Sequence, residues 1–360
     1  MQTVRRTGAA REDAMSRYNP QYFKCREVCP VCEAQGLETL YTCALTDDPV
    51  RSLLDSHYRA QGYVKWEWLE GTDYVVCSCN DCGLIFQRHV PTEALLCELY
   101  DGMIAPKPLA RLEARRLTVD NFEQIGGELS LLFRRLGKHP TEVSFLDYGF
   151  GHGRWARVAA AMGATVYATE ISPEKIAMAA GIGVRIIDDS ALDTMRFDIV
   201  HTEQVFEHLT DPARDFRRLS AALKPGGLMK VAVPPRGRIG QRLQSDGMIG
   251  RSPQEAEWNA KASRLPHLKD YVSILPLEHL NAYSAASIEH LARQNAMQVI
   301  SRVRRQSVAI SASSAGDLVR SLFRLAKVSL RPLVARNAGY FLLAAAHGSQ
   351  PMQARPAESP

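Results

Sequence analysis

The stretch that decides the fold is F-L-D-Y-G-F-G-H-G-R-W, residues 145–155, in which three glycines separate a buried strand from a helix. These glycines are Gly149, Gly151 and Gly153. Glycine is favoured where the backbone turns sharply or where a ligand approaches the main chain closely. A helix N-terminus adds free N–H groups at the same place. The turn therefore predicts a site for a nucleoside-containing ligand.

An acidic residue ends the strand that follows this turn. In A-T-V-Y-A-T-E the acid is Glu170, 17 residues after Gly153, which is close to the spacing that dinucleotide-binding folds use. A carboxylate at this position can accept hydrogen bonds from both hydroxyls of a ribose. The alternative is a tight turn beside an ordinary surface acid, which predicts no ligand.

Strands and helices alternate from residue 142 onward. The expected strands are VSFLDYG, ATVYATE, GVRIIDD, RFDIVHT and LMKVAVP, with helices such as HGRWARVAAAMG and DPARDFRRLSAALKPGG between them. MQVIS and GYFLLAAAH are the candidates for two final strands. This alternation predicts an α/β fold with a mainly parallel sheet that helices cover on both faces.

These motifs resemble the class I S-adenosylmethionine-dependent methyltransferases. A dinucleotide-binding fold would prefer G-x-G-x-x-G, whereas this chain has D-x-G-x-G-x-G from Asp147 to Gly153. The resemblance continues through RFDIVHTEQVFEHLTDP and LKPGGLMKVAVP and spans roughly residues 143–234. It implies a Rossmann-like seven-stranded sheet and S-adenosylmethionine as the cofactor.

The resemblance also implies which residues bind this cofactor. Asp147 would hold the turn and the methionyl ammonium region, Glu170 the ribose, and Ile171 the adenine. Asp189 and Ser190 would approach the adenine edge, although the adjacent Asp188 leaves that alignment open. The remaining implied positions are Gly149, Gly151 and Gly153 against the cofactor backbone, and Thr202 and Glu203 on the methionine side.

Methyl transfer to an oxygen or to an acidic carbon requires that a proton be removed from the acceptor. Histidine is the side chain best suited to this task near neutral pH. His208 follows the fourth strand, and His279 precedes a later helix. We predict that these two histidines act at the acceptor, with a surface or helix-capping role as the alternative for each.

All eight cysteines precede residue 98, which points to metal binding rather than to disulfides in a chain without a secretory signal. Cys29 and Cys32 form one C-x-x-C pair, and Cys79 and Cys82 form a second pair. Two such turns can supply a closed tetrahedral site for a structural zinc ion. Cys77 competes with Cys79 as a ligand, and buried free cysteines are the alternative to a metal site.

The stretch YVVCSCNDCGLIFQRHVPTEALLCELYD also resembles the zinc-ribbon leaders of some bacterial methyltransferases. Many of those enzymes act on sugars, polysaccharides or secondary metabolites, so the resemblance implies a small-molecule or glycan acceptor. Two other functions stay open. The chain could be an RNA methyltransferase whose zinc module binds RNA, or a non-catalytic binding scaffold.

The predicted organisation has five parts, one of them with an insertion. They are a disordered leader (1–21), a zinc-ribbon module (22–91, the N-terminal module below), a helical linker (92–138), a Rossmann-like methyltransferase domain (139–348) with an insertion (235–277), and a disordered tail (349–360).

The net charge of +5 is too small to indicate a nucleic-acid partner. No apolar run is long enough to span a bilayer, and the first residues lack a signal sequence, so we expect a cytoplasmic protein. Basic residues nevertheless gather near the C-terminus around the single acid Asp317: Arg302, Arg304, Arg305, Arg320, Arg324, Lys327, Arg331 and Arg336. This group predicts either a solvated helix face or a docking surface for an acidic substrate, a membrane or RNA.

Overall fold

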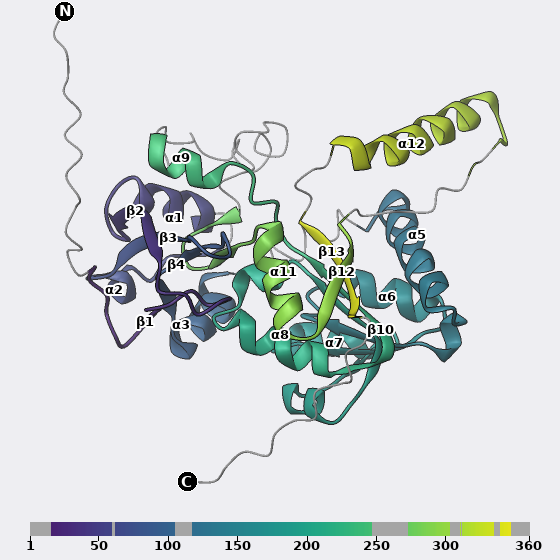
Figure 1. Ribbon diagram of the computed structural model, residues 1–360, viewed down its shortest axis with the longest axis horizontal. Helices are drawn as coiled ribbons and strands as arrows, with labels where there is room; N and C mark the ends of the chain where they lie inside the picture. The colour runs from purple at the N-terminus through teal and green to yellow at the C-terminus, as the bar shows by residue number, and fades with distance from the viewer. Residues whose placement is uncertain are drawn as a thin grey trace, which may run out of the picture.

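A computed structural model describes residues 16–59, 62–104, 117–246, 273–302, 310, 312–334 and 339–346. Residues 1–15 of the predicted leader, residues 247–272 of the predicted insertion and the whole predicted tail lie outside this described part. Figure 1 shows a smaller N-terminal body, drawn in purple, packed beside a larger α/β body.

Seven strands form the large sheet in the order β12-β13-β10-β9-β6-β7-β8. Their bounds are β6 (Ser144–Tyr148), β7 (Thr165–Thr169), β8 (Arg185–Ile186), β9 (Phe197–Glu203), β10 (Leu223–Ala232), β12 (Met297–Ser301) and β13 (Tyr340–Ala345). Neighbouring strands from β10 to β8 are parallel, and β13 is antiparallel to both β10 and β12. The predicted Rossmann-like seven-stranded sheet is confirmed. After β6 the chain adds β7 and β8 on one side of that strand and then β9 and β10 on the other side. The topological switch point therefore lies between β6 and β9, and folds of this kind bind ligands at that point.

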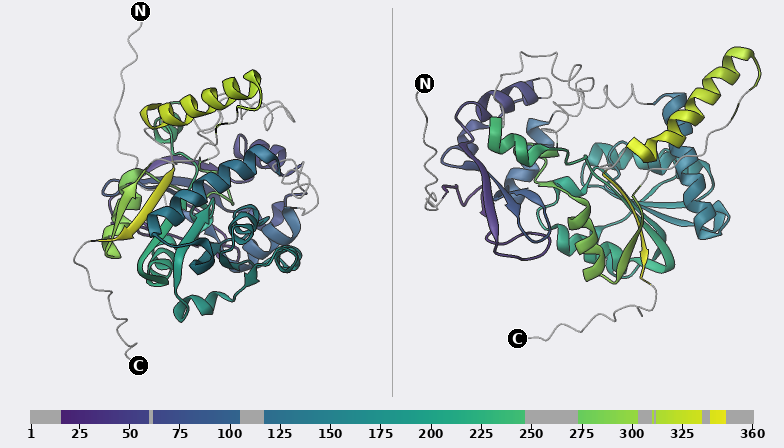
Figure 2. Two further views of the ribbon diagram at one scale, coloured as in Figure 1. Left: turned by 90° about the vertical axis from the view of Figure 1, so that its right-hand side faces the viewer. Right: turned by 45° about the horizontal axis from the view of Figure 1, so that its top comes forward.

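Helices cover both faces of this sheet (Figure 2). One face packs against α5 (Val119–Leu136), α6 (Arg154–Ala161) and α7 (Pro173–Ala180). The other face packs against the short helix η3 (Asp189–Asp193), α8 (Pro212–Ala221) and α11 (Ala285–Gln294).

Local sequence sets several helix ends. The hydroxyl of Thr118 accepts a hydrogen bond from the Asn121 N–H at the start of α5, and Gly137 ends that helix with φ +65°. Ser284 and Ser287 form a reciprocal capping box at the start of α11. These caps fix where α5 begins and ends and where α11 begins.

The N-terminal module contains a second sheet of four strands, in the order β11-β4-β3-β2. The elements of this region are β1 (Phe23–Cys25), β2 (Leu37–Ala44), α1 (Val50–Arg59), α2 (Trp66–Leu69), β3 (Asp73–Cys79), β4 (Ile85–Gln87), β5 (His89–Pro91), α3 (Glu93–Glu98) and the π-helical turn η1 (Leu99–Met103). β1 pairs separately with β5. The described end of the predicted leader is tied to this module, because the Arg17 N–H donates to Asp73 Oδ2 over 2.9 Å and the Asn19 N–H to Thr72 Oγ1 over 3.0 Å.

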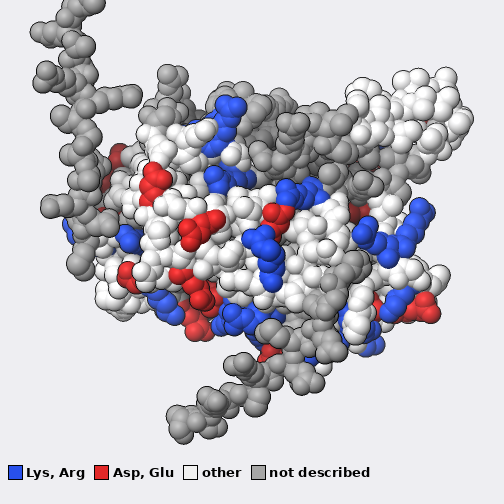
Figure 3. All heavy atoms as spheres, in the orientation of Figure 1, with Lys and Arg blue, Asp and Glu red and all other residues white. Residues whose placement is uncertain are grey.

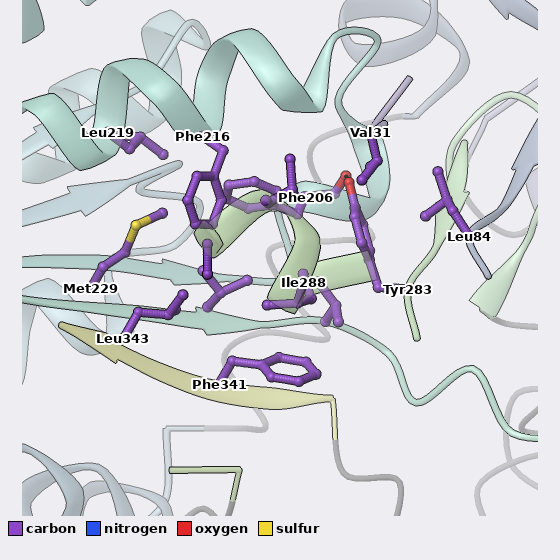
Figure 4. Packing of buried hydrophobic residues seen from close by; sticks show 14 of the residues in the cluster. Val31, Leu84, Phe206, Phe216, Leu219, Met229, Tyr283, Ile288, Phe341 and Leu343 are labelled. Carbon is purple, nitrogen blue, oxygen red and sulfur yellow. Dashed lines mark hydrogen bonds between the residues drawn. The ribbon is translucent and has the colours of Figure 1, made fainter. Parts of the chain in front are cut away.

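The fourth strand of this small sheet comes from the far end of the chain. β11 (Asn281–Ala282) follows the predicted insertion and pairs antiparallel with β4. The two bodies also share one apolar core: Figure 4 shows Val31 and Leu84 of the module beside Phe206 and Tyr283, and all four side chains are buried. The module and the large sheet are therefore packed as one continuous structure, while the predicted domain boundaries stay predictions.

Two helices complete the described chain. The start of the predicted insertion forms α9 (Ile239–Asp246), whose Ile239 and Leu243 pack into the core of the N-terminal module. Helix α12 (Ala315–Val334) lies in the connection between β12 and β13 and projects from the body in both views of Figure 2.

Candidate active site

The glycine turn connects β6 to α6, and its three glycines have positive φ values of +81°, +55° and +65°. A Cβ on Gly153 would lie 2.4 Å from Phe150 Cζ, and a Cβ on Gly149 would lie 2.7 Å from Val205 Cγ2. The nearest atom to a Cβ on Gly151 is 4.0 Å away. Two of the glycines thus allow close packing of the turn, and Gly151 leaves open space above its backbone.

Glu170 lies at the end of β7, directly beside this turn. Its Oε2 accepts from the Gly151 N–H over 3.0 Å, and its Oε1 accepts from the N–H groups of Ile171 and Ser172 over 2.9 and 3.0 Å. The carboxylate, rather than the hydroxyl of Ser172, therefore caps α7. Since a carboxylate oxygen can accept about two hydrogen bonds, acceptor capacity remains on Oε2.

The residues that the sequence assigns to the adenine lie on the surface around this edge. Ile171 is 80% exposed, which leaves an apolar side chain free to pack on a planar ring. Asp189 and Ser190 are exposed at the start of η3, where Asp189 pairs with Arg218. The carboxylate of Asp189 is thus already engaged by a cation.

The side chain of Asp147 is buried under the glycine turn and is not exposed at its surface. Its Oδ1 accepts a hydrogen bond from His201 Nδ1 over 2.7 Å, and Lys230 Nζ donates to His201 Nε2 over 2.9 Å. These three side chains occupy adjacent positions on β6, β9 and β10. Burial raises the pKa of Asp147 to about 8, although the charge of Lys230 acts in the opposite direction.

Lys230 makes further contacts outside the row that it forms with Asp147 and His201. Its ammonium group pairs with Glu203, lies 3.6 Å from Glu128 Oε1 on α5, and stacks 3.8 Å from the ring centre of Trp155. His201, Lys230 and Glu128 were not among the residues predicted from the sequence. The sequence did contain one signal for them, which is the charged Lys230 in the otherwise apolar strand LMKVAVP. A buried lysine requires polar partners, so its presence predicts buried acidic or polar side chains nearby.

The two residues predicted to lie on the methionine side, Thr202 and Glu203, differ in their exposure. Glu203 ends β9 and is partly exposed while it pairs with Lys230. Thr202 is fully buried, and its hydroxyl donates to the Lys230 carbonyl over 3.4 Å. Thr202 therefore presents no exposed surface to a ligand in this structure.

The structure brings His208 and His279 together. Their ring centres lie 4.7 Å apart, with the rings nearly perpendicular at 82°. His208 belongs to the short helix η4 (Phe206–His208), which follows β9, and His279 lies just before β11. Burial, and next the neighbouring His279, lower the pKa of His208 to about 3, so His208 is neutral at physiological pH.

A buried carboxyl group accompanies the two histidines. Neither oxygen of Glu207 has a hydrogen-bond partner among the described residues, and burial raises the pKa of this side chain well above its usual range. Glu207, His208 and His279 offer three ligand atoms within 4.8 Å of one another. Neutral imidazoles and a carboxylate are ligands that divalent transition metals accept, so this set could hold such a cation.

Tyr100 lies beside the histidine cluster. Its Oη lies 3.3 Å from His208 Nδ1. Burial raises the pKa of Tyr100, and the charges of Glu278, Glu207 and Glu170 raise it further. The loop that leads into His208 packs against the glycine turn, because Val205 Cγ2 lies 2.7 Å from the position of a Cβ on Gly149.

The N-terminal module holds the loops that carry these groups. Gln87 Nε2 donates to the His279 carbonyl over 2.9 Å, and the buried guanidinium of Arg26 donates to the carbonyls of Leu209 and Thr210. The Leu280 N–H in turn donates to the Glu207 carbonyl over 2.6 Å. The two candidate catalytic histidines therefore depend on the module for their positions.

The four predicted zinc ligands form one cluster. Cys29 Sγ lies 3.6 Å from Cys82 Sγ, Cys32 Sγ lies 3.4 Å from Cys79 Sγ, and all four sulfurs lie within 4.8 Å of one another. Zn–S bonds of about 2.3 Å in a tetrahedron would place the sulfurs about 3.8 Å apart. This arrangement is compatible with zinc, and Cys77 is not part of it.

Each C-x-x-C pair is built on the same type of turn. The residue after the second cysteine, Glu33 or Gly83, has a positive φ, of +60° and +68°. The second turn is anchored to the large body, because Ser284 Oγ donates to the Cys82 carbonyl over 3.1 Å and Arg236 donates to the Gly83 carbonyl. The cluster thus joins the two bodies where their cores meet.

Comparison with known proteins identifies relatives for the large body. Residues 121–301, about half of the chain, match a family model described as a methyltransferase domain. A ubiquinone biosynthesis O-methyltransferase of Parvibaculum lavamentivorans is 29% identical over 151 residues, which cover 39% of this chain and 58% of that protein. One from Bradyrhizobium sp. is 36% identical over 145 residues, which cover 37% and 54%. The chain thus spans about half the length of the curated relatives it matches.

Among solved structures, the plantazolicin methyltransferase BpumL in complex with SAH covers 71% of this chain and 95% of its own, at 15% identity and a TM-score of 0.43. The family assignment rests on the family model rather than on this distant likeness. The chain belongs to the methyltransferase-domain family, and the class I S-adenosylmethionine-dependent methyltransferase that its motifs predict is confirmed at the level of the family.

Proposed function

We propose that this protein transfers a methyl group from S-adenosylmethionine to a hydroxyl oxygen of a small-molecule acceptor. The observation that carries the proposal is the contact between His279 and His208, of which His208 follows β9 on a loop that packs against the glycine turn through Val205. The names of the relatives, which are O-methyltransferases of ubiquinone biosynthesis, support oxygen as the acceptor atom. A glycan hydroxyl would present the same chemistry.

The residues around the glycine turn fit the proposed cofactor. Gly151 leaves room for a ligand against the backbone, Glu170 retains acceptor capacity for a ribose hydroxyl, and Ile171 offers an exposed apolar face for adenine. Glu203 would lie on the methionine side, held by Lys230. When bound, the cofactor supplies an electrophilic methyl group on a sulfonium, and the protein supplies alignment and a base.

Within the histidine pair we assign proton removal to His279. A low pKa makes His208 a weak proton acceptor, so His208 serves as the neutral partner that orients the second ring. The buried carboxyl of Glu207 lies near both rings and would offer them a hydrogen-bonding partner. The proton of the acceptor hydroxyl would pass to the imidazole of His279 as the oxygen attacks the methyl carbon.

We also propose that Cys29, Cys32, Cys79 and Cys82 bind one structural zinc ion. The support is the clustering of their four sulfurs within 4.8 Å of one another, in buried or partly buried positions where the two bodies meet. The ion would hold the N-terminal module in the shape that positions His279.

The test is a screen of methyl acceptors with isotope-labelled S-adenosylmethionine, using hydroxylated aromatic compounds, sugars and RNA in parallel. Once an acceptor is found, His279→Ala should lower turnover by roughly 100-fold or more while cofactor affinity stays unchanged. His139→Ala serves as the matched control, since His139 is an exposed histidine that caps a surface turn.

Other outcomes would overturn parts of this proposal. Full activity of both His279→Ala and His208→Ala would exclude general-base catalysis by this pair. Methylation of RNA alone would replace the small-molecule acceptor. Absence of cofactor binding would leave a non-catalytic scaffold.

A further inference from the structure

Besides the cysteine cluster, the described residues contain a second group of candidate metal ligands. Glu207, His208 and His279 each bring one ligand atom, and the three atoms lie within 4.8 Å of one another. His208 Nε2 is 3.9 Å from Glu207 Oε1, and the ring centres of the two histidines are 4.7 Å apart. Zn–N and Zn–O bonds of about 2.1 Å in a tetrahedron separate ligand atoms by about 3.4 Å. One cation therefore fits between these groups after a small closure.

The carboxyl group of Glu207 is the independent reason to expect an occupant. This residue is fully buried, and neither of its carboxyl oxygens has a hydrogen-bond partner among the described residues. A buried polar group without a partner is rare in native proteins, because nothing compensates for its loss of hydration. A cation held between this carboxyl group and the two imidazoles would supply the partner.

The surroundings hold the ligands in place. Tyr100 Oη lies 3.3 Å from His208 Nδ1, which leaves Nε2 of that ring for a metal. Metal-binding histidines commonly use their second ring nitrogen in such a hydrogen bond. The backbone of His279 is fixed by Gln87, whose Nε2 donates to the His279 carbonyl over 2.9 Å, and the Glu207 carbonyl accepts from the next residue after His279 over 2.6 Å. The three ligands are thus positioned by protein contacts alone.

We propose that Glu207, His208 and His279 form an open binding site for one divalent transition-metal cation such as Zn²⁺. Two imidazole nitrogens and one carboxylate oxygen are the donor set of zinc sites that keep a fourth position open. Glu278 does not fill that position, because its carboxylate pairs with His57 over 2.8 Å. Mg²⁺ and Ca²⁺ prefer oxygen ligands and should bind poorly.

The consequence for catalysis rests on the proposed function. A cation on His279 occupies the imidazole that is assigned to proton removal, so Zn²⁺ should inhibit methyl transfer. The site itself is tested without a methyl acceptor, by calorimetric titration of the full-length protein with Zn²⁺ in buffer free of chelator. We expect one Zn²⁺ per chain whose binding depends on these ligands. Glu207→Gln and His279→Ala should each weaken it at least about tenfold, because each removes one ligand.

Two control variants separate this site from weak binding of Zn²⁺ at the surface, where Figure 3 shows acidic side chains interspersed with basic ones. Glu174→Gln removes an exposed carboxylate from the first turn of α7, and His139→Ala removes an exposed imidazole from a surface turn. Both should bind Zn²⁺ like the unaltered protein. A cooperative unfolding transition checks that Glu207→Gln and His279→Ala are folded, and either of them alone is sufficient for the test.

Equal Zn²⁺ binding by the unaltered protein and by both ligand variants would overturn the proposed site, and so would tighter binding of Mg²⁺ than of Zn²⁺ at these residues. Turnover then separates the metal site from the proposed function. With an acceptor from the screen, Zn²⁺ should inhibit the unaltered protein at the concentrations that fill the site. Binding without inhibition, or activation by the cation, would overturn the inhibition and the role of His279 as the base, while the metal site itself would stand.

Discussion

Glu170 illustrates how one side chain serves both the fold and the proposed site. Its carboxylate ties the N-terminus of α7 to the glycine turn through three backbone N–H groups. We expect Glu170→Ala to weaken S-adenosylmethionine binding by about 2 kcal/mol, roughly 30-fold, because a charge-assisted hydrogen bond to the ribose is lost. Calorimetry measures this loss, with Glu174→Ala on the exposed first turn of α7 as the control. Unchanged affinity would mean that the ribose binds elsewhere.

Single residues also show which parts of the candidate site can be predicted from a sequence and which cannot. The glycines and Glu170 could be assigned because their roles follow from local position beside a strand end. The row of Asp147, His201 and Lys230 could not, because it exists only when β6, β9 and β10 adopt a particular register. A lysine in an apolar strand signals an unknown buried partner but does not name it.

At the scale of elements, glycine-to-alanine substitutions in the turn between β6 and α6 should separate an effect on stability from an effect on cofactor binding. Gly153→Ala places a methyl group 2.4 Å from Phe150 Cζ at a positive φ, so it should lower the free energy of unfolding by about 2 kcal/mol or more. Gly151→Ala has open space and should cost only about 1 kcal/mol of left-handed strain. Its added methyl group should instead obstruct the cofactor.

Gly137→Ala is the control for this pair. Gly137 ends α5 at φ +65° with nothing near its missing Cβ, so its substitution measures left-handed strain alone. Chemical denaturation should rank Gly153→Ala as the least stable, and calorimetry should find weak cofactor binding for Gly151→Ala but not for Gly137→Ala. Equal cofactor affinity for these last two variants would contradict a ligand above Gly151.

The succession of strands and helices in the large body followed from their alternation in the sequence, and the seven-stranded sheet followed from the resemblance to class I methyltransferases. The fourth strand of the small sheet could not be foreseen, since β11 has only two residues and pairs with a strand about 195 residues earlier in the chain. A pairing between such distant segments leaves no local pattern. The predicted zinc ligands, in contrast, were readable because each pair lies on one short turn.

At the scale of the whole molecule, the shared core predicts that zinc stabilises both bodies together. Cys29→Ser should lower the zinc content and shift a single cooperative unfolding transition down by at least about 5 °C, because the cluster lies where the two cores meet. Elemental analysis and calorimetry measure these effects, with Cys97→Ser as the control because Cys97 is exposed and outside the cluster. Two separate transitions, with only one of them shifted, would show that the bodies unfold independently.

The hydrogen bonds from Gln87 and Arg26 to the loops of His279 and His208 have a consequence for engineering this enzyme. The glycine turn and Glu170 belong to the large sheet, whereas the proposed acceptor wall is assembled jointly by that sheet and the first hundred residues. Exchange of residues 16–104 between homologous proteins should therefore change which hydroxyl compound is accepted and leave cofactor affinity intact. A successful chimera would have to carry the matching segment 273–284 as well, because β11 in that segment pairs with β4 of the exchanged one.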